Sequence, residues 1–87
     1  MLSCKVTVRN PSGLNLRPAG LLCGEAIKYK SSVTFQYDGG TANAKSVLSV
    51  LGACVKSGDE ITLICDGEDE QEAIDALAVL IRSGLGE

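Results

Sequence analysis

The hydropathy pattern of this chain changes its period repeatedly, and this feature constrains the fold more than any other in the sequence. Apolar and polar residues alternate at the N-terminus, where the apolar positions are Leu2, Cys4, Val6 and Val8. A period of two predicts a strand with one buried face. From residue 19 the apolar residues recur at helical spacing, at Ala19, Leu22, Cys23, Ala26 and Ile27. This stripe predicts an amphipathic helix, joined to the strand by a turn over residues 10–13.

A hairpin and a second helix are predicted next. Val33, Phe35 and Tyr37 alternate as in a strand, and the turn residues 38–40 lead into a short partner strand over residues 41–44. A short helical stripe follows, at Val47, Val50, Leu51 and Cys54. Ser57-Gly58 is expected to end this helix.

The remaining residues predict one more strand and one more helix. Ile61, Leu63 and Cys65 alternate, and Ile64 makes the other face apolar as well, which suggests a central position in the sheet. A helix is expected over about residues 69–83. The order βαββαβα predicts an α+β fold in which helices cover one sheet face and the other face meets water.

Length and composition indicate one soluble domain over residues 1–87. Apolar residues make up 45% and charged residues 22% of the chain, which is normal for a globular protein and excludes disorder. No apolar run approaches the roughly 20 residues that cross a bilayer, and the N-terminus lacks a signal peptide. We therefore expect no membrane insertion and a cytoplasmic location.

The charges are unevenly distributed. The formal net charge is -3, which argues against direct binding of nucleic acid. Residues 1–58 carry seven basic and two acidic side chains, whereas residues 59–87 carry one basic and nine acidic side chains. The basic part could attract an acidic partner, or the asymmetry could be surface scatter combined with acids at a helix start. Four such acids are Glu68, Asp69, Glu70 and Glu72, and we favour a solvated helix start over a cation site.

Composition also restricts the chemistry. The chain contains no histidine, which excludes a Ser-His-Asp arrangement, a histidine-ligated metal and a phosphohistidine. None of the four cysteines forms a C-x-x-C motif, so we expect no metal, no cofactor and four reduced, buried thiols. Cys4 and Cys65 are expected on buried strand faces, and Cys23 and Cys54 in more accessible positions on helices.

Two junctions between loop and helix are candidate sites. Asn15 and Arg17 stand where the first helix begins, which suits either an anion site or simple N-capping by Asn15. Ser46 stands before the second helix beside Lys45 and is a plausible N-cap. A phosphate on Ser46 would meet helical N–H groups, although the pattern alone favours capping.

Four motifs together resemble the HPr family of the bacterial phosphotransferase system. They are Gly13-Leu14-x-x-Arg17-Pro18-Ala19, Asn43-Ala44-Lys45-Ser46-Val47-Leu48, Gly58-Asp59-Glu60-Ile61-Thr62 and Asp66-Gly67-Glu68-Asp69-Glu70-x-Glu72-Ala73. The resemblance implies an open-faced β-sandwich, with a four-stranded antiparallel sheet covered on one face by three helices. It also implies a protein that is not an enzyme.

The resemblance places Asn15 where the family carries its phosphoryl-accepting histidine. An amide nitrogen is neither a nucleophile nor able to hold a transferable phosphoryl group. Arg17, which attends the phosphohistidine in the family, is retained.

Ser46 matches the regulatory serine of the family. The expected partner-binding residues are Arg17, Lys45, Val47, Leu48 and Leu51. Loss of the histidine together with retention of the serine resembles the catabolite-repression branch, in which an HPr-type serine kinase modifies the serine and the product assists a LacI-type transcription factor. Enzyme I and sugar-specific phosphotransferase components are further implied partners. The alternatives are a phosphocarrier inactivated by a His-to-Asn change, including a paralogue that competes for phosphotransferase enzymes, and a binding module that merely shares the fold.

Overall fold

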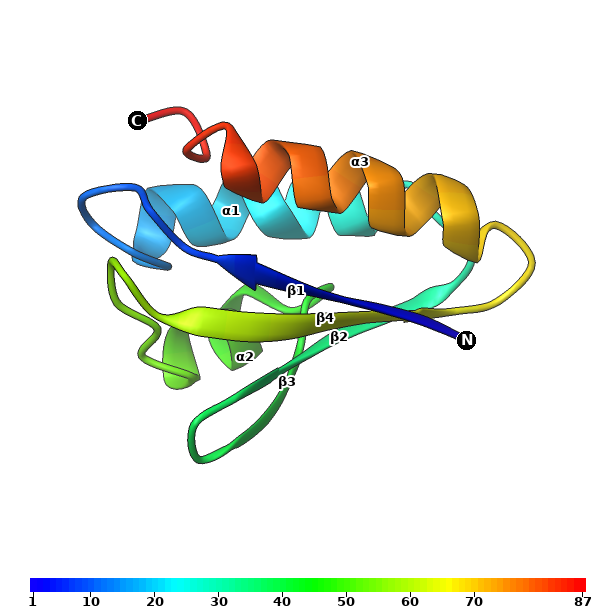
Figure 1. Ribbon diagram of the computed structural model, residues 1–87, viewed down its shortest axis with the longest axis horizontal. Coiled ribbons are helices and arrows are strands. Elements are labelled where there is room, and N and C mark those ends of the chain that lie inside the picture. The colour runs from blue at the N-terminus through cyan, green and yellow to red at the C-terminus, as the bar shows by residue number, and fades with distance from the viewer.

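The computed structural model describes residues 1–87 and contains four strands and three helices (Figure 1). The strands are β1 (Leu2–Thr7), β2 (Ser32–Tyr37), β3 (Gly40–Asn43) and β4 (Glu60–Asp66). The helices are α1 (Leu16–Ala26), α2 (Val47–Gly52) and α3 (Glu70–Arg82). Their order confirms the βαββαβα pattern and the predicted fold class.

The sheet is fully antiparallel, with the strand order β1-β4-β2-β3. Leu63 of β4 lies opposite Cys4 of β1 on one side and opposite Phe35 of β2 on the other. The central position of β4 confirms the prediction from its two apolar faces. Strands β1 and β3 form the two edges.

The helices bury one face of the sheet. Helices α1 and α3 run alongside each other above the sheet in Figure 1, and the shorter α2 contacts α1 and β3. The core between the layers contains Phe35, Leu22, Ile61, Leu63, Leu77, Ile81, Val8 and Val33, each at most 1% exposed. Phe35 is the largest of these side chains, so truncating it would cost about 3–5 kcal/mol by analogy with other cores.

The end of α2 differs from the sequence prediction. Helix α2 ends at Gly52 and not near Ser57, and Cys54 takes the left-handed conformation with φ +53°. This turn redirects the chain toward β4, which the apolar stripe could not reveal. Helix α1 begins at Leu16, directly after Asn15, as the capping interpretation of Asn15 expected.

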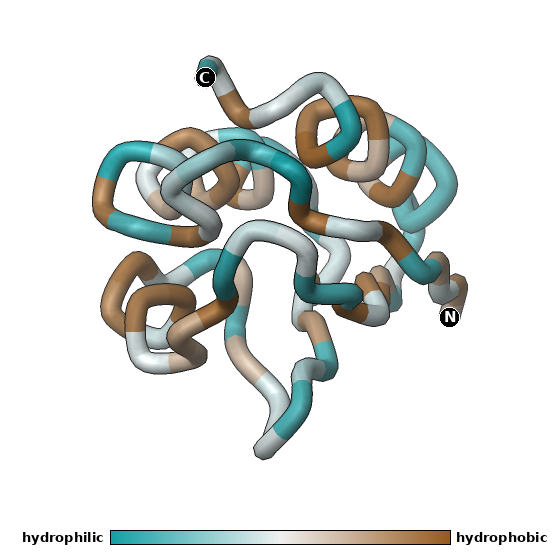
Figure 2. The backbone as a smooth tube through the Cα atoms, turned by 60° about the vertical axis from the view of Figure 1, so that its left-hand side comes forward, coloured by the Kyte–Doolittle hydropathy of each residue, from teal (hydrophilic) through white to brown (hydrophobic).

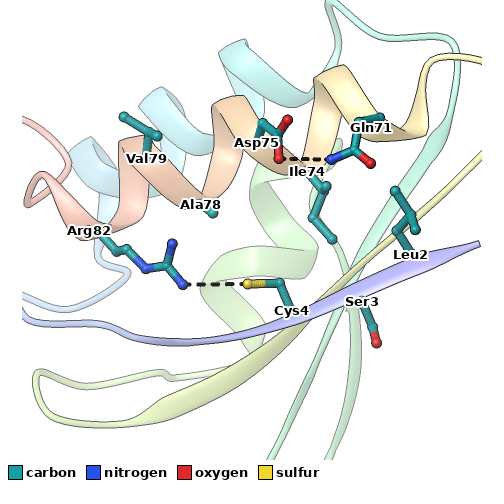
Figure 3. A pocket seen from close by; sticks show the side chains of 9 residues that line it. All are labelled: Leu2, Ser3, Cys4, Gln71, Ile74, Asp75, Ala78, Val79 and Arg82. Atoms are coloured by element: carbon teal, nitrogen blue, oxygen red, sulfur yellow. Dashed lines mark hydrogen bonds between the residues drawn. The ribbon is translucent and has the colours of Figure 1, made fainter.

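The prediction that all four thiols are buried is wrong for two of them. Cys54 is exposed, because the helix ends before it. Cys4 is half-buried, because it faces the open space between the edge strand β1 and α3, where Arg82 Nη2 donates a 3.5 Å hydrogen bond to its sulfur (Figure 3). Cys23, which was expected to be more accessible than the strand thiols, is buried, and its Sγ lies 3.1 Å from the carbonyl oxygen of Lys45. Cys65 is fully buried, as expected.

Two further features of the chain concern membranes and metals. No helix has the length and the apolar character that crossing a membrane requires. No group of three or more histidine, cysteine or acidic side chains is arranged to hold a metal ion.

Candidate functional site

Asn15 caps the first turn of α1. Its backbone is extended, with φ -79° and ψ -176°, and its side chain accepts a hydrogen bond from the Leu16 N–H at 2.9 Å. Its backbone carbonyl accepts from the Ala19 N–H at 2.8 Å, which closes the first turn. The capping interpretation of Asn15 is therefore confirmed. The residue is exposed, so groups on a partner can reach it.

The loop before Asn15 is fixed against the segment between α2 and β4. Gly13 has φ +64°, and a Cβ atom there would lie 2.5 Å from the carbonyl oxygen of Val55. The Leu14 N–H donates to that same carbonyl at 3.0 Å. A glycine is required at position 13 for both its backbone angle and this close approach.

This contact creates a hollow of about 220 Å³ beside Asn15. Its lining residues are Ser12, Leu14, Asn15, Leu51, Cys54, Val55 and Lys56. The structure thus brings together Asn15 and Leu51, two predicted site residues that lie 36 positions apart in the sequence.

Arg17 is exposed on the first turn of α1, and it forms no ion pair within 4 Å of the carboxylate of Glu87. Hydrogen bonds from Asn10 and Ser12, with a smaller contribution from the charge of Arg17, lower the pKa of Glu87. Glu87 was not predicted from the sequence as a site residue. Its contacts with Asn10 and Ser12 depend on the path of the chain after α3, and no sequence motif indicates them.

Ser46 caps α2 and is half-buried. Its hydroxyl oxygen accepts from the Ser49 N–H at 3.3 Å, and Ser49 Oγ accepts in turn from the Asn43 N–H at 2.9 Å. The predicted capping role of Ser46 is confirmed. Helix α2 has only six residues, so its first N–H groups matter more than a macrodipole for any charge placed here.

Lys45 is held in place by the fold. Its ammonium group donates to the backbone carbonyl of Tyr29 at 2.7 Å, and its N–H donates to Asn43 Oδ1 at 3.0 Å. The side chain is half-buried and links the segment before α2 to the end of α1. Lys45 therefore orients the neighbourhood of Ser46 and does not extend as a free cation.

The apolar residues of the site differ in exposure. Leu48 is 82% exposed, whereas Val47 and Leu51 are half-buried and pack against the core. Most of α2 is coloured as hydrophobic in Figure 2. Leu48 is the exposed large hydrophobic residue of this helix. On α1, Leu16 is 67% exposed next to Asn15. Leu16 was not predicted from the sequence as a site residue. The signal that could have identified it is its apolar side chain, which lies outside the predicted buried stripe of this helix.

The chain matches known proteins along nearly its whole length. A sequence model described as the PTS HPr component phosphorylation site matches residues 2–83. The chain belongs to the HPr family. Members of this family interact with phosphotransferase components such as enzyme I and the sugar-specific proteins.

Its relatives include regulatory and phosphocarrier proteins. The chain is 44% identical to the HPr-like protein Crh of Bacillus subtilis over 82 residues, covering 94% of this chain and 96% of Crh. It is 38% identical to the phosphocarrier protein HPr of Lysinibacillus sphaericus, covering 93% and 92% of the two chains. The crystal structure of HPr-C-His from Thermoanaerobacter tengcongensis superimposes with a TM-score of 0.96 at 37% identity, covering 100% of this chain and 98% of that one. These similarities support a role in the phosphotransferase system and catabolite repression.

Proposed function

We propose that this chain is a non-enzymatic regulatory protein of carbon catabolite control that acts in the cytoplasm. Its signal is phosphorylation of Ser46, and its output is docking to another protein. The observation that carries this proposal is Asn15, an exposed N-cap at the position that resembles the family's phosphohistidine, in a chain without any histidine.

The chemistry of Asn15 supports a protein that carries no phosphoryl group at this position. The lone pair of the amide nitrogen is delocalised into the carbonyl, so it cannot attack a phosphoryl donor. The side-chain oxygen is already used as the acceptor for Leu16. Position 15 therefore contributes to the structure of α1.

The environment of Ser46 supports a switch based on surface charge. A phosphate on Ser46 would add about two negative charges next to the first N–H groups of α2. Leu48, two residues further on, is almost fully exposed and offers an apolar anchor. A partner could pair an arginine with the phosphate and bury Leu48. An HPr-type serine kinase and a LacI-type transcription factor are the proposed modifying enzyme and target, and Crh as a relative at 44% identity favours this branch.

A second candidate function is a phosphocarrier inactivated by a His-to-Asn change, which could compete for enzyme I and sugar-specific components. The retained Arg17 and the 38% identity to a phosphocarrier protein favour this alternative. Both functions would use the same surface around Asn15, Ser46 and Leu48. They differ in their dependence on Ser46, because the regulatory protein requires its phosphorylation and the inactivated phosphocarrier does not.

Two parallel phosphorylation reactions test the proposal. Incubation with ATP and the serine kinase should add one phosphate, which should disappear in Ser46→Ala and persist in a Ser57→Ala control. Incubation with phosphoenolpyruvate and enzyme I should leave the protein unlabelled. Acid-labile phosphate in the second reaction would contradict the proposal.

The variant Asn15→His examines whether the surface still recognises enzyme I. Because Arg17, Pro18 and the start of α1 are in place, this variant should accept phosphate at least slowly.

Titration of the transcription factor with the Ser46-phosphorylated and the unmodified protein completes the test of the proposal. Equal affinity of the two forms would remove Ser46 from the mechanism.

A further inference from the structure

Strand β1 is an edge of the sheet, so half of its backbone hydrogen-bonding groups face away from β4. The Val8 N–H donates to the carbonyl of Asp59 at 2.8 Å, and the bonded positions alternate along an antiparallel pair. By this alternation the N–H and C=O groups of Ser3, Lys5 and Thr7 point outward, and no other backbone group pairs with them. This edge can therefore accept a further strand.

A groove of about 420 Å³ lies between this edge and α3 (Figure 3). The helix covers β1 incompletely here, because Val6 is 3% exposed whereas Leu2 and Cys4 on the same face are half-buried. Val79 of α3 lines the groove and is 66% exposed. The apolar layer between helix and sheet thus stays open at this edge, and apolar side chains of an added strand would close it.

Arg82 gives the groove a positive charge that has no acidic partner. Its Nη2 donates to Cys4 Sγ at 3.5 Å across the space between α3 and β1 (Figure 3), and none of the four ion pairs of the structure includes it. Asp75 also lines the groove, but its carboxylate accepts from Gln71 Nε2 at 3.0 Å. A thiol sulfur is a weak acceptor, so a carboxylate on the occupant would be a better partner for Arg82.

The strand β1 of a second copy would not supply this carboxylate. Residues Leu2–Thr7 contain no acidic side chain, and their only charged residue is Lys5. Pairing of two β1 strands would bring two lysines to the same edge, and like charges on paired strands are destabilising. Charge complementarity therefore favours an acidic segment of a different protein.

We infer that the groove between β1 and α3 binds an extended, acidic segment of a partner protein, which adds to the four-stranded sheet as a fifth strand beside β1. Main-chain hydrogen bonds to the outward groups of β1 would hold the segment, its alternate apolar side chains would contact Val79, and its carboxylate would pair with Arg82. The edge β1 lies opposite β3, the strand that α2 contacts, so this surface is separate from Ser46. The inference does not rest on the proposed function.

NMR titration of the ¹⁵N-labelled full chain with a synthetic peptide tests this inference. The peptide has about seven residues, enough to pair along β1, and both of its ends are blocked. Valine alternates with threonine, and one glutamate replaces the central valine. A matched peptide carries glutamine in place of the glutamate, and another has the same composition in an order that breaks the alternation. The readout is the amide resonances of Ser3, Lys5 and Thr7, with Leu48 on the Ser46 surface as an internal control.

The glutamate peptide should shift the outward amides of β1 downfield and slow their hydrogen exchange, because new hydrogen bonds form there. It should bind about two- to fivefold more tightly than the glutamine peptide, as expected for an exposed ion pair. Arg82→Gln should remove this difference. Lys5→Pro should weaken both peptides, because it removes an outward N–H without removing a bond to β4. Lys5→Gln loses the same charge but keeps the N–H, so it should bind as wild type does.

A second pair of variants keeps the test decisive if Lys5→Pro does not fold. Val79→Ala should weaken both peptides, whereas Leu48→Ala, which truncates an exposed apolar residue of α2, should not. Equal binding by Val79→Ala and wild type would overturn the contact with the groove.

Three further results would overturn the inference. Unchanged outward amides of β1 would exclude strand addition, and equal binding of the peptide without alternation would exclude an extended occupant. A preference for glutamate that survives in Arg82→Gln would remove Arg82 from the site. Concentration-dependent shifts of the same amides without any peptide would assign the edge to a second copy of this chain and not to an acidic partner.

Discussion

The carboxylate of Asp69 accepts hydrogen bonds from the hydroxyl of Ser31 at 2.5 Å and from its backbone N–H at 2.9 Å. It also accepts from the Lys30 N–H at 2.8 Å. Asp69 precedes α3 directly, yet its side chain does not cap that helix. It joins the start of α3 to the segment before β2, and Gly67 makes this approach possible, since a Cβ atom there would lie 2.6 Å from Ser31 Cα.

This contact makes the free energy of unfolding depend on pH in the acid range. Hydrogen bonds from Ser31 and Lys30 lower the pKa of Asp69 from 3.8 to about 2. A lowered pKa means that the ionised form stabilises the fold, fully above about pH 4, and that this contribution is lost as the pH falls through about 2. Asp69→Asn should therefore lower the free energy of unfolding at neutral pH, and the difference from wild type should vanish near pH 2.

Urea unfolding of both proteins across this pH range measures the difference, with Glu72→Gln as a control for an acid on the exposed side of α3. A difference that stays constant from neutral pH down to about 2 would show that Asp69 does not act through its charge.

Two glycines should respond in opposite directions to the same substitution. Gly13→Ala forces a Cβ atom to 2.5 Å from the carbonyl of Val55 at φ +64° and should destabilise the protein by about 2–4 kcal/mol. Gly20→Ala places its Cβ in open space on α1 and should stabilise by about 0.5–1 kcal/mol. Thermal unfolding of the two variants and of wild type measures both changes in stability. A stabilised Gly13→Ala would mean that the loop before Asn15 is not fixed as described.

The four thiols should react at different rates with an aromatic disulfide reagent. Exposed Cys54 should react first, half-buried Cys4 second, and Cys23 and Cys65 only on unfolding, because they are buried. Single Cys-to-Ser variants assign each phase. Rapid reaction of Cys65 in the folded protein would contradict the central position of β4.

Ser46 should contribute to stability as a cap, apart from any role as a switch. Ser46→Ala removes the acceptor for the Ser49 N–H and should cost about 0.5–2 kcal/mol. Ser46→Asp restores an N-cap acceptor and should return most of this stability. Denaturant unfolding of the three proteins measures the effect. Equal losses in both variants would show that the hydroxyl has a contact that a carboxylate cannot replace.

The sequence by itself determined the elements and the caps. Periods of two and of 3.6 residues are local properties, so the order of strands and helices, the central character of β4 and the capping roles of Asn15 and Ser46 could be read directly. The motifs around Arg17 and Ser46 also identified the family. Side-chain type alone indicated that position 15 cannot carry a phosphoryl group.

Only the tertiary structure decided which groups meet. Cys4 is half-buried because β1 is an edge strand, and Cys54 is exposed because the chain turns after Gly52. Lys45 is anchored to Tyr29, and Glu87 is bound to Asn10 and Ser12. These contacts join residues distant in the sequence, and their geometry depends on how the helices pack on the sheet. A periodicity records which face of an element is buried, but it carries no information about what lies opposite that face.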